Sequence, residues 1–365
     1  TIVSGTVLVG CNLVATTDAN NGVIDLGTTT VDGTVALNTH GTGAATIVND
    51  SGLNFVASTV GGALSATATT GDITDSGALA ITGAATFITG ATGSNIVLDH
   101  ASNAFSNSVE LRADAGNEAF GNITFVDSAA IDFATSAGTN GDLFINGSTD
   151  GAVGGNLSVT ATTGNITDTV ALTVSGTTTL TTSANNATIA LNNTSNAFTG
   201  ALTITTNDDS GTDADVTIDG GTTALNIGAS TIDGDLTVTS GNASGVTDSG
   251  TVTVGGNLVA TTDANNGVIT LDQTTVTGTM DLTSHGTGNV TIDNATTDIV
   301  LIASEIGGNL TLTTGNASGI IDSGTVTVGG NLVATTDANN GVIDLGTTTV
   351  TGTMDLTSHG TGNVT

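Results

Sequence analysis

One long segment of this chain occurs three times, and this repetition restricts the possible folds more than any other feature. Residues Thr251–Ile269 recur unchanged as Thr325–Ile343, and Thr6–Ile24 is a third copy with two substitutions. Repetition of large blocks is the sequence signature of a solenoid, in which each repeat packs only on its neighbours. We therefore expect one repeating architecture and not a set of separate globular domains.

A shorter period lies beneath these blocks, as between Gly308 and Gly330, each of which begins a Gly-Asn-Leu unit. Within each unit, apolar and polar residues alternate, as in Leu157–Ala161, and clusters of Gly, Asn, Asp and Ser separate the alternating runs. Alternation of this kind is typical of strands with one buried face. The sequence therefore predicts an all-β fold, a parallel β-helix solenoid with roughly 16 to 18 coils of about 20–23 residues over 1–365.

The composition agrees with a β-solenoid and argues against a disordered chain. There are 52 Gly and no Pro, the hydrophobic fraction is 37%, and the mean hydropathy is +0.27. Disordered sequences lack aliphatic residues and are enriched in Pro, Glu and Lys. Proline would remove a hydrogen-bond donor from the ladder between coils, so its absence fits stacked parallel strands.

The charge excludes several classes of partner. The net charge is −32, with 33 acidic residues and one basic residue, Arg112. Binding to nucleic acid or to an anionic membrane depends on Lys and Arg, so we expect neither, and no apolar run is long enough to insert into a membrane. The single cysteine, Cys11, excludes an internal disulfide framework and stands where the other copies carry Gly. A polyanionic surface suits an extracellular setting that supplies salt and divalent cations.

Two stretches suggest departures from a regular rod. The region of about 87–144 holds six of the eight Phe and the only Arg, so we expect irregular coils there within a single continuous solenoid. The motif around Phe105 returns around Phe198, which predicts equivalent core or corner positions for the two rings. Thr365 aligns with Thr291, in the middle of a repeat, so we expect a segment of a longer chain or a filament.

Calcium is the best chemical hypothesis for a site. Two patterns place oxygen ligands close together, as hard cations require, although plain turns are the preferred explanation of the first pattern. The first is the repeated Asp-Ala-Asn-Asn-Gly turn, with candidate ligands Asp18, Asn20, Asp263, Asn265, Asp337 and Asn339. The second is an acidic run with candidate ligands Asp208, Asp209, Asp213 and Asp215.

The histidines do not indicate catalysis. His40, His285 and His359 are copies of one repeat position, and His100 stands apart without a Cys or a distinctive Ser motif. Paired Asp residues on adjacent coils could hydrolyse a polysaccharide, and this stays a lesser alternative. We expect the protein not to be an enzyme.

The units Gly155–Asp168 and Asn192–Ile204 resemble the repeats of filamentous-haemagglutinin-type adhesins and autotransporter passenger domains. The resemblance implies a right-handed parallel β-helix, export to the surface of a bacterium, and a role in adhesion, aggregation or an external fibre. The expected function is thus an extracellular structural and adhesive stalk. The alternative is a self-assembling filament or surface-layer subunit assisted by Ca²⁺. The expected partners are copies of the chain itself or a host or neighbouring cell surface.

Overall fold

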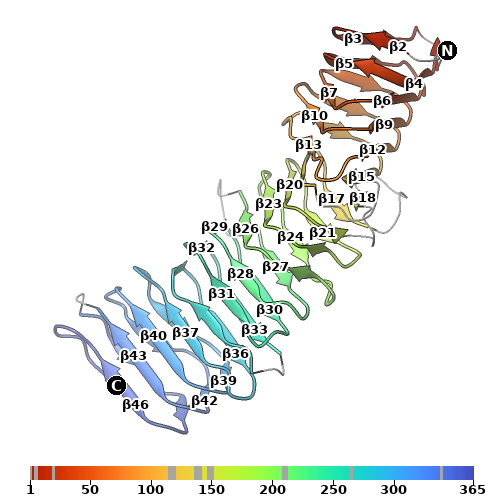
Figure 1. Ribbon diagram of the computed structural model, residues 1–365. Coiled ribbons are helices and arrows are strands. Elements are labelled where there is room, and N and C mark those ends of the chain that lie inside the picture. Colours follow the sequence, from red (N-terminus) through yellow and green to blue (C-terminus); the bar gives the residue numbers. More distant parts are fainter. Residues whose placement is uncertain are drawn as a thin grey trace. The chain divides into compact units, whose positions relative to one another are not determined.

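The computed structural model describes residues 2–3, 7–18, 21–113, 121–134, 142–145, 152–207, 213–263, 266–337 and 340–365. The chain divides into two compact units, Thr1–Ala184 and Asn185–Thr365. In each unit short parallel strands stack into a β-solenoid, as Figure 1 shows, and the two units together have about 15 turns. The described residues form no helix. The predicted fold class is confirmed, with slightly fewer coils than the expected 16 to 18.

The first unit has two main parallel sheets, which we call sheet A and sheet B. Sheet A contains β1 (Ile2–Val3), β2 (Val7–Val9), β4 (Ile24–Val31), β6 (Ala45–Asn49), β9 (Leu64–Ala68), β12 (Ala85–Thr89), β15 (Val109–Ala113), β17 (Ile131–Phe133), β18 (Asp142–Ile145) and β21 (Ile166–Asp168). Sheet B contains β3 (Leu13–Thr16), β5 (Thr34–Asn38), β7 (Leu53–Phe55), β8 (Ser58–Val60), β10 (Ile73–Asp75), β11 (Leu79–Ile81), β13 (Ile96–Leu98), β14 (Ala104–Phe105), β16 (Ile123–Asp127), β20 (Leu157–Ala161) and β23 (Thr178–Thr182). A further pair is formed by β19 (Ala152–Val153) and β22 (Thr173–Val174).

The second unit also has strands in a sheet A and a sheet B. Sheet A contains β24 (Ile189–Leu191), β27 (Val216–Asp219), β30 (Leu236–Ser240), β33 (Leu258–Thr262), β36 (Met280–Ser284), β38 (Ile299–Leu301), β39 (Ser304–Ile306), β41 (Ile320–Asp322), β42 (Val326–Val328), β44 (Ile343–Asp344) and β45 (Thr348–Val350). Sheet B contains β26 (Leu202–Thr205), β28 (Leu225–Ile227), β29 (Ser230–Ile232), β31 (Val246–Asp248), β32 (Val252–Val254), β34 (Ile269–Leu271), β35 (Thr274–Val276), β37 (Val290–Asp293), β40 (Leu310–Thr314), β43 (Leu332–Thr336) and β46 (Met354–Thr357). The short β25 (Ala197–Phe198) lies between β24 and β26 in the sequence.

A typical coil consists of one longer strand in one sheet and two shorter strands in the other. In one coil of the second unit, β30 lies in sheet A, and β31 and β32 lie in sheet B. Successive coils keep the same register, so that Leu236 pairs with Leu258 and Leu258 with Met280. These three side chains are almost completely buried. Inward aliphatic residues thus form a continuous column, while Thr, Val and Asp at alternate positions face outward.

The identical copies of one segment lie in opposite sheets. Leu258–Thr262 forms β33 in sheet A, and the same sequence at Leu332–Thr336 forms β43 in sheet B. The cause is that the number of residues from Leu258 to Leu332 is not a multiple of the number of residues in one coil. One coil is the step from Leu236 to its partner Leu258 in the next coil. Each block therefore ends part of a turn out of phase with its start, which the repeats alone did not indicate.

The coils between about residues 96 and 166 are larger than a typical coil, and the coil from Ile189 to its partner Val216 is as long as the coil from Ile96 to Ile123. Ile96 pairs with Ile123, and Ile123 pairs with Leu157, so each of these coils takes up more of the chain than the coil between Leu236 and Leu258. Aromatic rings fill the core beside the larger coils. A buried column is formed by Phe55, Phe87, Phe105 and Phe125, with centroid separations of 6.2, 6.1 and 5.2 Å. Phe105 and Phe198 are both buried, as the repeated motif predicted.

Buried asparagines hold adjacent coils together at one corner. Asn294 is fully buried, its Oδ1 accepts the N–H of Val276 at 2.7 Å, and its Nδ2 donates to the carbonyl oxygens of Val276 and Asp298. Asn49 makes the same contacts with Val31, whose N–H nitrogen lies 2.9 Å from Asn49 Oδ1. Each of these side chains replaces backbone partners that the corner removes, so it satisfies groups that would otherwise be buried without a hydrogen bond.

Only some of the glycines and asparagines at the corners have left-handed conformations. Positive φ occurs at Asn21, Asn266 and Asn340, and at glycines such as Gly286. The glycine of the Gly-Asn-Leu corner is different, because Gly256 does not have positive φ. A Cβ atom there would collide with the side chain of Asp235 in the preceding coil. Close packing between coils is therefore the reason for glycine at this corner.

Candidate functional site

The repeated turns predicted as cation sites stack directly on a second repeated turn. We call Thr262–Gly267 and its copies Thr17–Gly22 and Thr336–Gly341 the Asp turns. We call Ser284–Gly288 and its copies Thr39–Gly43 and Ser358–Gly362 the His turns. In each copy the first residue of the turn donates its hydroxyl proton to the carbonyl of the glycine that ends the turn, as Thr262 does to Gly267 at 2.9 Å. The three copies therefore share this hydrogen bond between the two ends of each turn.

The histidine of each His turn is hydrogen-bonded to the Asp turn of the preceding coil. His285 Nδ1 lies 2.6 Å from the carbonyl oxygen of Thr262, and His40 and His359 repeat the contact at the same distance. Because a carbonyl only accepts, Nδ1 carries the proton and Nε2 holds the lone pair in the neutral ring. The imidazole thus ties two coils together. His100 has another local role, since its Nδ1 accepts the N–H of Ser102 at 3.1 Å.

The asparagine before the last glycine of each Asp turn forms the second contact between the turns. Asn266 has a φ of 55°, and its Oδ1 accepts the N–H of Thr287 at 2.9 Å. Asn21 and Asn340 repeat this bond to the His turns that follow them, at 2.8 Å. Sequence reasoning treated these turns as possible ligand sets and missed that this amide joins two coils. The glycine that follows each of these asparagines and the constant spacing to the His turn are the sequence signals that could have revealed it.

The predicted ligands of the Asp turns are only partly visible. Asp18, Asp263 and Asp337 are exposed, and the backbone N–H of Asp263 continues the ladder by donating to Ser240. Asn20, Asn265 and Asn339 lie outside the described residues. The structure therefore shows where one carboxylate of each turn lies, but not the predicted set as a whole.

The acidic run is divided in the same way, because Asp208 and Asp209 lie outside the described residues. Asp213 is exposed, and both of its carboxylate oxygens lie 2.6 Å from one end of the Asn186 side-chain amide. We assign this end as the NH₂, because only a donor can bond to two carboxylate oxygens. Asp215 Oδ1 accepts the N–H of Asp235 in the next coil at 2.8 Å. These two carboxylates thus have structural partners. In the part of the chain that is described, no three His, Cys, Asp or Glu side chains lie close enough to hold a metal ion.

The bond from Asp215 belongs to a ladder of side chains, each at the residue just before a strand, which we call the corner ladder. The side chain of each member accepts the backbone N–H of the equivalent residue one coil further on, at distances of 2.6 to 2.9 Å, and the threonine that ends each run takes part only as a donor. In the second unit the ladder runs through Asp215, Asp235, Asn257 and Thr279, and again through Asn289, Asn309, Asn331 and Thr353. In the first unit it runs through Asp72, Asn95, Asn122, Asn156 and Thr177. The Asn of Gly-Asn-Leu is therefore a bridge between coils.

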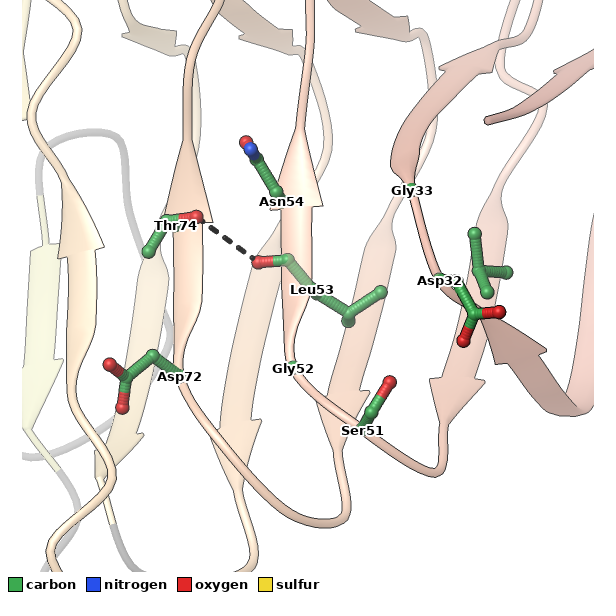
Figure 2. Close-up of a pocket in the computed structure, with 9 residues that line it drawn as sticks. Asp32, Gly33, Ser51, Gly52, Leu53, Asn54, Asp72 and Thr74 are labelled. Carbon is green, nitrogen blue, oxygen red and sulfur yellow. Dashed lines mark hydrogen bonds between the residues drawn. The ribbon is translucent and has the colours of Figure 1, made fainter. Parts of the chain in front are cut away.

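A shallow groove of about 330 Å³ lies where the corner ladder of the first unit is interrupted. The position equivalent to Asp72 in the coil before it is Gly52, which has no side chain to bridge the coils. Figure 2 shows the carboxylates of Asp32 and Asp72 on opposite sides of Gly52 and Leu53. Thr74 Oγ1 donates to the carbonyl of Leu53 at 3.4 Å. The groove offers hydroxyl and carboxylate oxygens, with no basic side chain in its lining.

Two carboxylates of the first unit are buried beside these corners. Asp127 is 2% exposed and accepts the N–H of Phe105 at 3.0 Å, and Asp75 accepts the side-chain N–H of Asn103 at 2.6 Å. Burial raises the pKa of both carboxyl groups, against the opposing effect of these hydrogen bonds. Both carboxylates use their oxygens to hold backbone or side-chain N–H groups of a neighbouring coil, so we assign both to the structure of the corner.

The raised pKa values predict that the protein gains stability in mild acid. A carboxyl group whose folded pKa is raised stabilises the fold fully below its unfolded pKa of 3.8, and this contribution is lost as the pH rises through the folded pKa. We expect the urea midpoint of the full chain to rise between pH 7 and pH 4. Asp127→Asn keeps an oxygen for Phe105 and should show a smaller rise. Asp25→Asn, at an exposed position, is the control, and an equal rise in both variants would contradict the assignment.

The model of the family described as repeats of unknown function (DUF5649) matches residues 42–112, 120–205, 213–283 and 287–345, which make up well over half of the chain. The chain belongs to the DUF5649 family. The third and fourth DUF5649 segments begin at positions 213 and 287, and this offset equals the one between Thr251 and Thr325, where the identical blocks begin. The DUF5649 repeat thus corresponds to the block that changes sheets, and not to a single coil.

No curated protein and no solved structure matched this DUF5649 chain. None of the described residues forms a helix long and apolar enough to cross a membrane.

Proposed function

We propose that this DUF5649 chain is an extracellular structural and adhesive stalk of a bacterial surface protein. The observation that supports this most directly is the connection between coils. Backbone ladders, the corner ladder and the paired Asp and His turns all join one coil to the next within each unit. Such an arrangement transmits force along the stack through many parallel hydrogen bonds, and it leaves alternate side chains of both sheets available for contact.

Calcium is the proposed partner of the Asp turns. Asp18, Asp263 and Asp337 expose one carboxylate at the same place in each copy. Carboxylate and carbonyl oxygens are the ligands that Ca²⁺ prefers, and a turn supplies both. In a chain of net charge −32, bound cations would also reduce the repulsion between neighbouring carboxylates.

Electron microscopy of the natively purified protein, with the intact polypeptide mass, tests the structural role. A stalk predicts thin single rods from a polypeptide larger than 35.1 kDa. Long uniform fibres built from chains of that mass would instead favour the alternative, a self-assembling filament or surface-layer subunit. Compact particles without rods or fibres would overturn both roles.

Calcium binding is tested separately, by adding a chelator to the same material and by measuring the melting temperature with and without Ca²⁺. We expect the melting temperature to rise with Ca²⁺, because an ion that binds only the folded state stabilises it. Substitution of Asp263 and Asp337 by Asn should reduce the rise. An unchanged rise in this double variant would show that the ions bind elsewhere.

A further inference from the structure

A second groove, of about 310 Å³, lies on the outer face of sheet A in the second unit. It lies where one strand, β36, pairs with two shorter strands of the next coil, β38 and β39. The start of β36 pairs with β38, as Met280 with Leu301, and its end pairs with β39, as Thr283 with Glu305. Three residues lie between Leu301 and Glu305, one more than between their partners Met280 and Thr283. The extra residue bends the chain at Ile302 and Ala303 and opens the groove.

The groove carries two carboxylates that its structural equivalents lack. In each of three coils a buried serine hydroxyl accepts the backbone N–H of the facing strand, and this bond identifies equivalent positions. Relative to this bond, Asp281 and Glu305 correspond to Ala36 and Thr59 in the first unit. In the coil that contains Ser230 they correspond to Thr203 and Thr231. Both carboxylates are therefore absent from the other two coils that have this bond. Asp281 recurs in the repeated block as Asp355, whereas Glu305 replaces the Thr231 of the block before it and is one of only three Glu in the chain.

The two side chains face the same surface at a separation that a single group can bridge. Asp281 and Glu305 both occupy outward positions of their strands, one strand apart and two positions apart along the sheet. That offset places their Cα atoms about 8 Å apart. Burial raises the pKa of Asp281, and no hydrogen bond opposes the effect. A half-buried carboxylate that is not stabilised by a hydrogen bond favours a ligand that supplies a hydrogen-bond donor.

We propose that this groove binds a lysine side chain of a partner protein. The ammonium group has three N–H donors, enough for the carboxylates of Asp281 and Glu305 and a threonine hydroxyl. The four-carbon stem would lie on Ala303 and on the methyl groups of Thr325 and Thr327, which also line the groove. The charge of −32 favours a cationic partner over a neutral or anionic one.

The composition excludes another copy of this chain as the source of the lysine. The single basic residue is Arg112, so the sequence contains no lysine at all. An amino sugar offers the same ammonium group, but its ring is covered with hydroxyls and lacks the apolar stem. This inference deepens the proposed adhesive role by naming a partner, and it rests on that role only for its biological setting.

The test uses the full chain and NMR titration with a blocked peptide that contains one lysine. We expect shifts of the amide signals of Thr283, Glu305 and Thr327, and no binding when the lysine is acetylated. The double variant Asp281→Thr with Glu305→Thr copies the residues Thr203 and Thr231 of the equivalent coil, so it should fold normally, as circular dichroism will check. It should bind the peptide at least fivefold more weakly.

A charge-matched control removes two exposed carboxylates elsewhere, by Asp344→Thr and Asp355→Thr. Equal loss of affinity in the control and in the groove variant would overturn the proposal, because attraction to the overall charge would then explain the binding. Equal affinity for a glucosamine oligomer would overturn the choice of lysine. Absence of peptide binding by well-folded protein would reject the groove as a lysine site and leave the stalk, which microscopy tests, untouched.

Discussion

Replacing Asn294 with alanine should lower the free energy of unfolding by about 3–5 kcal/mol, because three buried polar groups would lose their partners at a cost of about 1–3 kcal/mol each. The side chain is fully buried and satisfies the N–H and carbonyl of Val276 and the carbonyl of Asp298. Urea denaturation followed by circular dichroism measures the loss. Hydrogen exchange at the Val276 amide should show it locally.

The control is Asn363→Ala, because Asn363 is exposed. Its effect should stay within about 0.5 kcal/mol. If Asn294→Ala destabilised the protein no more than this control, water would have to replace the lost side chain at the corner. Unchanged exchange at Val276 would support the same conclusion and would refute the structural role of the buried amide.

Replacing Phe87 with alanine should cost a similar amount, about 3–5 kcal/mol, in the first unit. Phe87 lies between Phe55 and Phe105 in the buried column, with edge-to-face contacts to both. Its loss would remove these contacts and leave a cavity that the stacked coils cannot close, because their spacing is fixed by the ladder of backbone hydrogen bonds. Urea denaturation of the full chain is the measurement.

The adjacent Ile88 provides the matched control, since it belongs to the same strand but is only half-buried, on the outer side. Ile88→Ala should cost less than about 1.5 kcal/mol, the lower end of the range for a fully buried isoleucine side chain. Equal losses in the two variants would mean that the aromatic column contributes no more than the outer face. Binding of a small aromatic solute to Phe87→Ala, seen as partial recovery of the urea midpoint, would confirm that a cavity had formed.

The repeating architecture could be predicted from the sequence because its spacing is written in the residues. The Gly-Asn-Leu units recur at the length of one coil, and the alternation within Leu157–Ala161 matches the buried and outward positions of β20. The burial of both Phe105 and Phe198 could be predicted for the same reason, although β14 belongs to sheet B and β25 does not. A repeated motif in a solenoid returns to the same environment whenever the number of residues between the copies fits the coils.

The roles of individual asparagines could not be predicted in this way. Asn294 points into the core, Asn309 bridges coils at a corner, and Asn266 adopts a left-handed turn. What separates them is the direction of the side chain at a bend, which depends on contacts between coils and not on the local sequence. Asp215 illustrates the consequence, since a predicted cation ligand serves as a corner bridge.

The mismatch between the repeated block and the coil has an evolutionary consequence. Recombination between two identical blocks adds or deletes one complete block, and every residue beyond the junction then moves to the opposite sheet, as comparison of β33 and β43 shows. A single duplication event would thus reverse the side on which all later side chains are displayed, without a single point mutation. The number of blocks that such a gene encodes would therefore determine which of the two sheets displays a binding surface, as well as the position of that surface along the chain.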